Sequence, residues 1–262
     1  MEFFATAGGI SVHISDTQKG DNCLILLHGY LETMYIWNEF IDLISDDYRV
    51  IAIDLPGHGL SGSTQVNTMD FDAQTVKEVL DKCGVQHASI GGHSLGGYVA
   101  LACCDLYPEV FDKLILFNSH PFPDPVEKVN DRGREIGIIE NGKLGVLASA
   151  SIPKMYSNVN LRRLDDKIME TVEICDAHDP QGIVASIKGM MQRPDRQEFL
   201  LNTKIPVLLI YGQTDNFMQA EMIDKLKDKF KNVKFLEAPL TGHNSFLEAP
   251  DIVLKGVKEF LR

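Results

Sequence analysis

A serine in a glycine-rich turn is the residue of this sequence best suited to nucleophilic catalysis. The segment reads Gly92-His93-Ser94-Leu95-Gly96, a G-x-S-x-G pattern between a short apolar run and a stretch of helical periodicity. A sharp strand-to-helix turn strains the serine backbone, so the positions two before and two after it must lack side chains. We predict that Ser94 is a nucleophile and that the Leu95 N–H, at a helix N-terminus, stabilises an oxyanion. The alternative is an ordinary glycine-rich turn.

A serine hydroxyl is a weak nucleophile without a base, and the base needs an acid to orient it. Asp215 follows the apolar run 206–211, and His243 follows the run 233–237. Both residues are therefore expected at the carboxyl ends of strands, on the same sheet edge as Ser94. Taken singly, Asp215 is equally typical of a helix N-cap and His243 of a solvated loop. Together with Ser94 they predict a catalytic triad, in which Asp124 is the rival acid.

The loop after the apolar run 24–27 offers a second oxyanion donor. It begins His28-Gly29-Tyr30, and the glycine permits close backbone approach. We predict the Tyr30 N–H as that donor. His28 and His93 are expected to brace their loops rather than to catalyse.

Cofactor and metal sites are not predicted. The segment 57–62 spells G-x-G-x-x-G, but loop residues follow it where a dinucleotide site requires a helix. The eight histidines include no H-E-x-x-H and no paired metal spacing. The five cysteines form no C-x-x-C pair, so we expect reduced, mostly buried thiols.

The elements that position these residues alternate between two periodicities. Short apolar runs typical of buried parallel strands lie at 23–27, 50–53, 87–90 and 114–117. Stretches with helical spacing lie at 34–45, 71–83 and 95–106. This alternation predicts the α/β class with a doubly wound parallel sheet, and residues 3–14 predict an antiparallel hairpin on one edge.

The pattern changes after Asn118, where three prolines follow. Residues 122–201 show helical periodicity and no convincing strand, and strand patterns resume only at 206–211. We therefore expect a core domain of residues 1–121 and 202–262 with a helical cap of residues 122–201. Its methionines, which are Met155, Met169, Met190 and Met191, are expected to roof the pocket over Ser94. Basic cap residues such as Arg132 and Arg134 are candidates to hold one carboxylate.

Length and charge exclude several classes of function. The 262 residues carry a formal net charge of −12, which repels phosphate backbones and anionic lipid surfaces. Nucleic-acid and membrane partners are therefore not expected. No apolar stretch approaches the roughly 20 residues of a membrane span, and the first residues lack a signal-peptide pattern. We expect a cytoplasmic protein with a small-molecule acyl substrate, as a monomer or homodimer.

Together these motifs resemble the α/β-hydrolase superfamily. The resemblance rests on His28-Gly29, Trp37, the segment 48–61, Gly92 to Gly97, Asp215 and Gly242-His243. It implies an eight-stranded, mostly parallel sheet with a helical lid after the sixth strand. It also implies acyl transfer by Ser94, His243 and Asp215, with the Tyr30 and Leu95 amides as oxyanion hole. Serine at the nucleophile position argues against the dehalogenase and epoxide-hydrolase branches.

Three functional classes follow from this reading. A serine hydrolase of carboxylic esters or related acyl compounds is favoured. The second is a lyase that uses the same triad as a general base, because the His28-Gly29 loop also resembles 2-succinyl-6-hydroxy-2,4-cyclohexadiene-1-carboxylate synthase. That enzyme usually has arginine directly after the twin glycines, where this chain has Tyr98. The third is a ligand-binding protein, which has no physical need for a complete triad.

Overall fold

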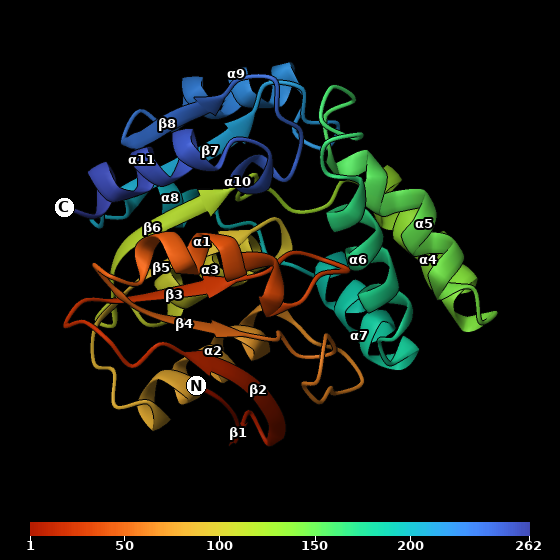
Figure 1. Ribbon diagram of the computed structural model, residues 1–262, viewed down its shortest axis with the longest axis horizontal. Helices are drawn as coiled ribbons and strands as arrows, with labels where there is room; N and C mark the ends of the chain where they lie inside the picture. The colour runs from red at the N-terminus through yellow and green to blue at the C-terminus, as the bar shows by residue number, and fades with distance from the viewer.

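An eight-stranded sheet forms the centre of the protein, and the computed structural model describes all 262 residues (Figure 1). The strands lie in the order β1-β2-β4-β3-β5-β6-β7-β8. β1 and β2 form an antiparallel hairpin, β2 pairs antiparallel with β4, and the other neighbours are parallel. Their bounds are β1 Glu2–Ala7, β2 Ile10–Asp16, β3 Cys23–Leu27, β4 Arg49–Ile53, β5 Ala88–His93, β6 Phe111–Phe117, β7 Val207–Gly212 and β8 Val233–Ala238. The predicted α/β fold with a mostly parallel sheet is confirmed.

The central strands are apolar because helices cover both faces of the sheet. Every residue of β3 and of β7 is buried. β6 begins at Phe111, three residues before the apolar run that predicted it, because Asp112 is exposed and interrupts that run. The side chains on both faces of the sheet therefore belong to one continuous hydrophobic core.

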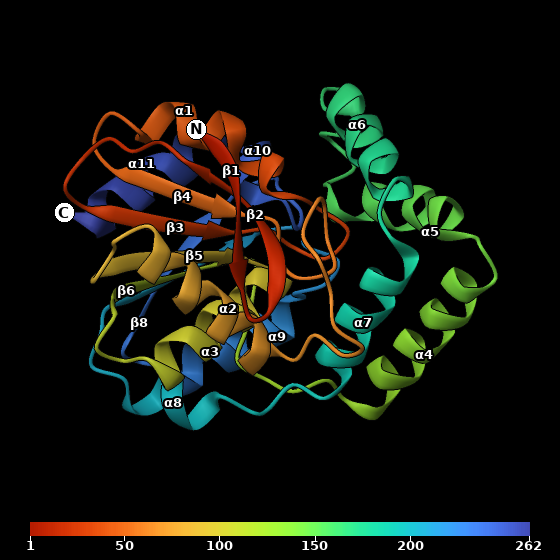
Figure 2. The same cartoon turned by 90° about the horizontal axis from the view of Figure 1, so that it is seen from below.

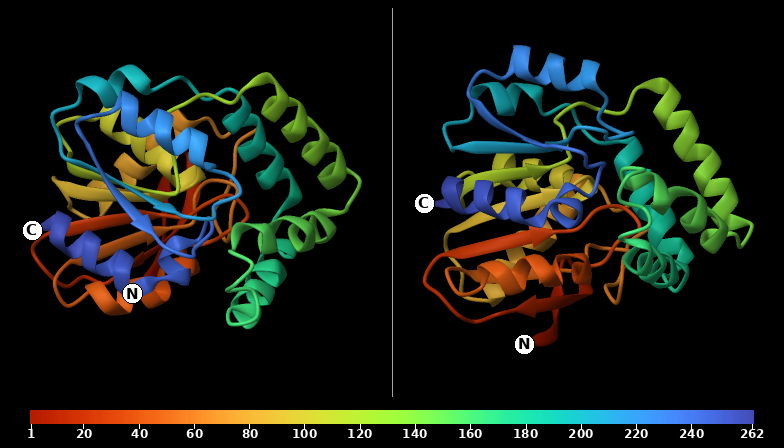
Figure 3. Two further views of the ribbon diagram at one scale, coloured as in Figure 1. Left: turned by 90° about the horizontal axis from the view of Figure 1, so that it is seen from above. Right: turned by 45° about the horizontal axis from the view of Figure 1, so that its top comes forward.

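Helices on the two faces come from different parts of the chain. α1 (Asn38–Ile44) and α11 (Pro250–Leu261) cover one face, and α2 (Met69–Lys82), α3 (Leu95–Leu106) and α9 (Ala220–Lys229) cover the other (Figures 2 and 3). The predicted helix at 34–45 is divided into a 3-10 turn, η1 (Met34–Trp37), and α1. A four-residue helix, α10 (Ser245–Glu248), precedes α11 and is too short for a periodic signal.

Between β6 and β7 the chain forms helices and no strand. They are α4 (Val126–Glu140), α5 (Leu144–Ser151), η2 (Ile152–Met155), α6 (Asp165–Asp176), α7 (Pro180–Met191) and α8 (Gln197–Asn202). Figure 1 shows α4 to α7 at the end of the sheet toward which the parallel strands point. α8 instead lies near α3, away from the other four (Figure 2).

Three buried histidines, His28, His58 and His178, lie where the inserted helices contact the sheet loops. We call them the histidine cluster. The ring centroid of His58 is 5.1 Å from that of His28 and 5.6 Å from that of His178, which lies between α6 and α7. Burial lowers the pKa of all three side chains, most strongly for His58. The cluster is therefore neutral at pH 7.

No helix in the structure has the length and apolar character needed to cross a membrane.

Candidate active site

Ser94 occupies a strained turn between β5 and α3. Its φ of 48° and ψ of −109° lie in a region that non-glycine residues rarely adopt. A Cβ on Gly92 would collide with the carbonyl oxygen of Gly96, and a Cβ on Gly96 would collide with that of Leu27. The two glycines thus allow the turn to form, as the spacing predicts.

His243 and Asp215 are joined across the ends of β7 and β8. The His243 Nδ1–H donates to Asp215 Oδ2 at 2.7 Å, and both side chains are at most 5% exposed. Burial alone would raise the pKa of Asp215, but the adjacent His243 and further hydrogen bonds hold it below its usual value. The ionised carboxylate fixes the proton on Nδ1, so Nε2 is left as an acceptor.

Ser94 and His243 line the same cavity, which has a volume of about 670 Å³. Neither Ser94 Oγ nor His243 Nε2 has a hydrogen-bond partner within the chain, so both are free to meet a ligand. Catalytic hydrogen bonds are often loose before substrate binds. Tyr30, Met155 and Met190 also line this cavity.

The two predicted oxyanion donors lie in the loops beside Ser94. Leu95 is the first residue of α3, where backbone N–H groups have no intrahelical acceptor. Tyr30 follows Gly29, whose own N–H donates to Glu32 Oε2 at 2.7 Å, and Leu31 after it has a φ of 66°. The register of β3 beside β5 pairs Leu27 with Gly92, which brings the two loops together.

Asn118, a residue that sequence reasoning passed over, holds Asp215, the predicted acid. It follows β6 with a φ of 49°, and its Nδ2 donates to Asp215 Oδ2 at 2.9 Å and to the Gly242 carbonyl at 3.1 Å. Its Oδ1 accepts from Ser245 Oγ at 2.6 Å. An asparagine directly after a strand is a signal for such a turn, because asparagine tolerates positive φ.

A buried pair of Glu32 and His93 connects three loops of the site. His93 Nδ1 donates to Glu32 Oε2 at 2.8 Å, and Nε2 donates to the His243 carbonyl at 3.0 Å. Burial alone would raise the pKa of Glu32, but the adjacent His93 holds it below its usual value. His93 thus braces the site, as expected. His28 does the same through the Gly29 carbonyl and the Leu55 N–H.

Asp124, the rival acid, does not contact His243. Its carboxylate instead binds Arg132 and Arg193, each at 2.5 Å. It lies in the same cavity as Ser94, so it belongs to the wall of the site.

The inserted helices reach the site through η2. The Met155 carbonyl accepts from the His243 N–H at 2.6 Å and from the Asn244 N–H at 3.2 Å. Of the four methionines predicted to roof the pocket, Met155 and Met190 line it, whereas Met169 is 50% exposed. The prediction that Met169 roofs the pocket is wrong, because periodicity does not tell which face of an inserted helix points toward the site.

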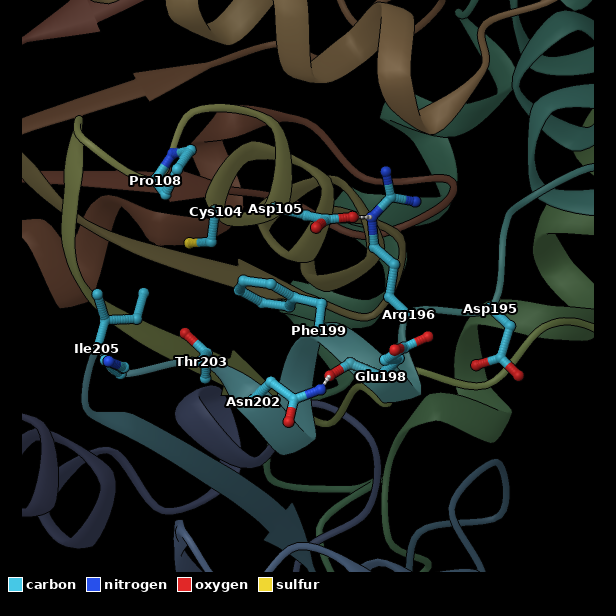
Figure 4. Close-up of a pocket in the computed structure, with 11 residues that line it drawn as sticks. Cys104, Asp105, Pro108, Asp195, Arg196, Glu198, Phe199, Asn202, Thr203 and Ile205 are labelled. Carbon is cyan, nitrogen blue, oxygen red and sulfur yellow. Dashed lines mark hydrogen bonds and ion pairs between the residues drawn. The ribbon is translucent and has the colours of Figure 1, made fainter.

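A second cavity of about 660 Å³ lies between α3 and α8 (Figure 4). Asp105 and Arg196 face each other there with 3.4 Å between their nearest atoms, and Cys104 lies beside them. Burial raises the pKa of the Cys104 thiol, and no histidine lines the cavity. The arrangement therefore has no activated nucleophile.

Two features bear on the metal and dinucleotide motifs considered in the sequence. No three His, Cys, Asp or Glu side chains are grouped to hold a metal ion. In the segment 57–62, a Cβ on Gly59 would collide with the Asp54 carboxylate, and the Leu60 N–H donates to Asp54 Oδ2 at 3.0 Å. A carboxylate inside this turn opposes phosphate binding.

Comparison with known proteins gives a consistent result. A family model described as alpha/beta hydrolase fold matches residues 22–134 and 153–250. The chain is 26% identical to the uncharacterized hydrolase YugF of Bacillus subtilis, over 98% of this chain and 96% of that protein. It is 28% identical to a 2-hydroxy-6-oxononadienedioate/2-hydroxy-6-oxononatrienedioate hydrolase of Paraburkholderia phymatum, over 89% and 85%. A thermophilic esterase from Thermogutta terrifontis, solved with malate bound, superposes with a TM-score of 0.93 at 26% identity, covering 100% of this chain and 98% of that one.

Proposed function

Because this chain belongs to the α/β-hydrolase family, we propose that it cleaves carboxylic esters or related acyl compounds through Ser94, His243 and Asp215. One observation carries the proposal. His243 is held by Asp215 in the tautomer whose Nε2 is an acceptor, in the cavity that also contains the strained Ser94.

The reaction follows from these positions. Ser94 Oγ attacks the substrate carbonyl while His243 Nε2 takes its proton, and Asp215 stabilises the resulting imidazolium. The oxyanion that forms accepts hydrogen bonds from the N–H groups of Tyr30 and Leu95. Collapse expels the alcohol, which receives the proton from His243. A water molecule, activated by the same histidine, then hydrolyses the acyl-enzyme and frees Ser94.

Helices α4 to α7 form the cap in this proposal. They lie over the carboxyl ends of the strands, so substrate reaches Ser94 between the cap and the sheet loops. A cap in this position limits water around the developing charge and shapes the acyl pocket. The cytoplasmic location and the monomeric or homodimeric state stay predictions from the sequence.

A fluorophosphonate probe tests the proposed nucleophile. We expect covalent labelling and hydrolysis of p-nitrophenyl acetate by the unaltered protein, and neither by Ser94→Ala. Ser149→Ala removes an exposed hydroxyl on α5 and serves as the matched control. Activity should persist in EDTA. Labelling that survives Ser94→Ala would refute the assignment.

The lyase that uses the same triad is the second candidate. One observation favours it, since the Arg193 guanidinium lies 4.0 Å from the ring centroid of Tyr98, the residue that follows the twin glycines where that enzyme has arginine. A protein that eliminates a carboxylate-bearing leaving group but leaves every ester in a panel intact would select this reading.

A further inference from the structure

Two buried arginines share one carboxylate at a wall of the cavity that contains Ser94. Arg132 on α4 donates from Nε to Asp124 Oδ2, and Arg193 after α7 donates from Nη1 to Asp124 Oδ1. The side chains of Arg132, Arg193 and Asp124 are 6%, 4% and 3% exposed. Two guanidiniums and one carboxylate leave one positive charge unmatched within the group. A buried charge is costly unless an anion matches it.

Both guanidiniums keep unused donors. Arg132 binds Asp124 through Nε alone, so its two Nη groups have no partner in the chain. Arg193 uses Nη1 and Nε, which donates to the Phe122 carbonyl at 3.0 Å, and its Nη2 has no partner. The Tyr98 ring, 4.0 Å from the Arg193 guanidinium carbon, fixes the plane of that group. Both arginines line the cavity, so these donors are available to a ligand.

The neighbouring titratable groups do not occupy the free donors of the arginine pair. Burial lowers the pKa of Arg132, but Asp124 first, and then Tyr98 and Glu135, raise it above its usual value. Glu135 forms no hydrogen bond or ion pair with Arg132, so it leaves the Nη donors of Arg132 free. His120 is neutral, because burial and the nearby Arg193 lower its pKa to about 3. The arginine pair therefore keeps its free donors at neutral pH, and His120 adds no charge to it.

The cavity as a whole has the opposite sign to the protein. Its basic lining residues are Lys128, Arg132, Arg193 and Lys225, and its acidic ones are Asp124 and Asp195. The protein carries a net charge of −12. A basic cavity within an acidic molecule concentrates anionic ligands at this one place.

The arginine pair lies close to the nucleophile. Tyr98 follows Ser94 by four residues at the start of α3, about 6 Å along the helix axis, and its N–H donates to the Ser94 carbonyl at 3.3 Å. Because Arg193 stacks on Tyr98, its guanidinium is within reach of a substrate group a few bonds from the reacting carbonyl.

We propose that Arg132 and Arg193 bind a carboxylate of the substrate, so that the preferred substrates are esters that carry a free carboxylate. This inference rests on the proposed function and specifies its substrate class. The carboxylate accepts from the unused Nη groups, while the ester carbonyl lies against Ser94. Binding thereby gives the free Nη groups an anionic acceptor, and the hydrolytic chemistry is unchanged.

The first test compares isosteric esters that differ in charge. Mono-p-nitrophenyl glutarate carries a carboxylate where p-nitrophenyl 5-methylhexanoate carries an isopropyl group. We expect kcat/KM to be about 10- to 100-fold higher for the glutarate, the range that charge-assisted hydrogen bonds provide. In Arg132→Gln and Arg193→Gln that ratio should fall toward one, chiefly through KM. Arg134→Gln, an exposed change on the same helix, is the matched control and should keep the ratio.

A second pair locates the carboxylate. 4-Acetoxybenzoate and its methyl ester place the charge on the leaving group instead of the acyl group. A preference for the anionic ester in either pair supports the site and shows which part of the substrate reaches it. No preference in either pair overturns the inference.

A measurement on the unaltered protein covers the case in which the arginine variants fail to fold. Glutarate should inhibit p-nitrophenyl acetate hydrolysis competitively, and the neutral glutaramide should not. Equal inhibition by both compounds, or by neither, would overturn the inference while the serine hydrolase assignment stands. If p-nitrophenyl acetate is not hydrolysed, the proposed function fails, and a thermal shift with glutarate but not glutaramide still decides the subsite.

Discussion

Replacement of Asp215 by asparagine tests whether this carboxylate sets the tautomer of His243. Oδ1 of Asp215 accepts from the backbone N–H groups of Phe217 and Met218 at 2.7 and 3.2 Å. Oδ2 accepts from His243 Nδ1 at 2.7 Å and from Asn118 Nδ2 at 2.9 Å. All four partners are donors, so an amide NH2 fits neither position well.

The fixed backbone donors decide how the asparagine amide turns. Its oxygen will face Phe217 and Met218, and its NH2 will face His243. The imidazole must then accept at Nδ1 and carry its proton on Nε2, where it cannot deprotonate Ser94. The same change in a serine protease lowers kcat by about 10⁴, or about 5.5 kcal/mol of transition-state stabilisation. The new NH2 group will also face the Asn118 NH2, and these two donors without an acceptor will lower the free energy of unfolding by about 1–3 kcal/mol.

Stopped-flow hydrolysis of p-nitrophenyl acetate measures the loss, and thermal unfolding checks that the variant is folded. Asp228→Asn, a change at an exposed aspartate, is the control and should keep full activity. A loss of less than about tenfold in folded Asp215→Asn would refute the tautomer argument. If Asp124→Asn proved more damaging toward this uncharged acetate ester, the acid would be misassigned.

Three further predictions concern the turn, the histidine cluster and the cap. Gly92→Ala should abolish activity and soluble expression, because the new Cβ overlaps the Gly96 carbonyl. Gly133→Ala lies in open space on α4 and should raise the free energy of unfolding, measured by urea titration, by about 1 kcal/mol. The histidine cluster has pKa values below the ordinary 6.5, so the unfolded chain binds more protons than the folded protein at acidic pH. The free energy of unfolding should therefore fall as the pH drops below about 6.5, by up to about 1.4 kcal/mol per pH unit for each histidine. An unfolding midpoint that is unchanged between pH 7.5 and 5 would contradict this. Met155→Ala and Met190→Ala should shift the ranking of p-nitrophenyl acyl chain lengths without loss of fluorophosphonate labelling, and an unchanged ranking would make these methionines structural cover only.

The triad candidates were accessible to sequence reasoning because each follows a strand. The apolar runs before Ser94, Asp215 and His243 fix their places at one sheet edge once the strands are parallel. The bracing contacts were not accessible. Glu32 and His93 are 61 residues apart and meet because β3 lies beside β5, an adjacency that periodicity does not specify.

The arginine pair shows the same limit. Asp124 lies between β6 and α4, Arg132 lies within α4, and Arg193 follows α7. Neither periodicity nor strand order indicates that charges on these separate segments will meet. Sequence reasoning proposed Arg132 and Arg134 together as carboxylate ligands. The Arg134 side chain is 72% exposed and pairs with Asp131, because two residues along a helix turn it by about 200° from Arg132.

The contact between η2 and His243 limits how far the cap is a separable module. The Met155 carbonyl holds the N–H groups of both His243 and Asn244, and Glu248 holds the N–H groups of Gly242 and Ser157. A rigid-body movement of the whole inserted segment would therefore displace His243, the proposed general base, relative to Ser94. In a chimera that takes its lid from a relative, residues 152–157 should be inherited with the sheet rather than with the lid. Exchange of the outer helices α4 and α5 leaves the contact between Met155 and His243 in place. New acyl pockets can therefore be introduced there without changing the residues around His243.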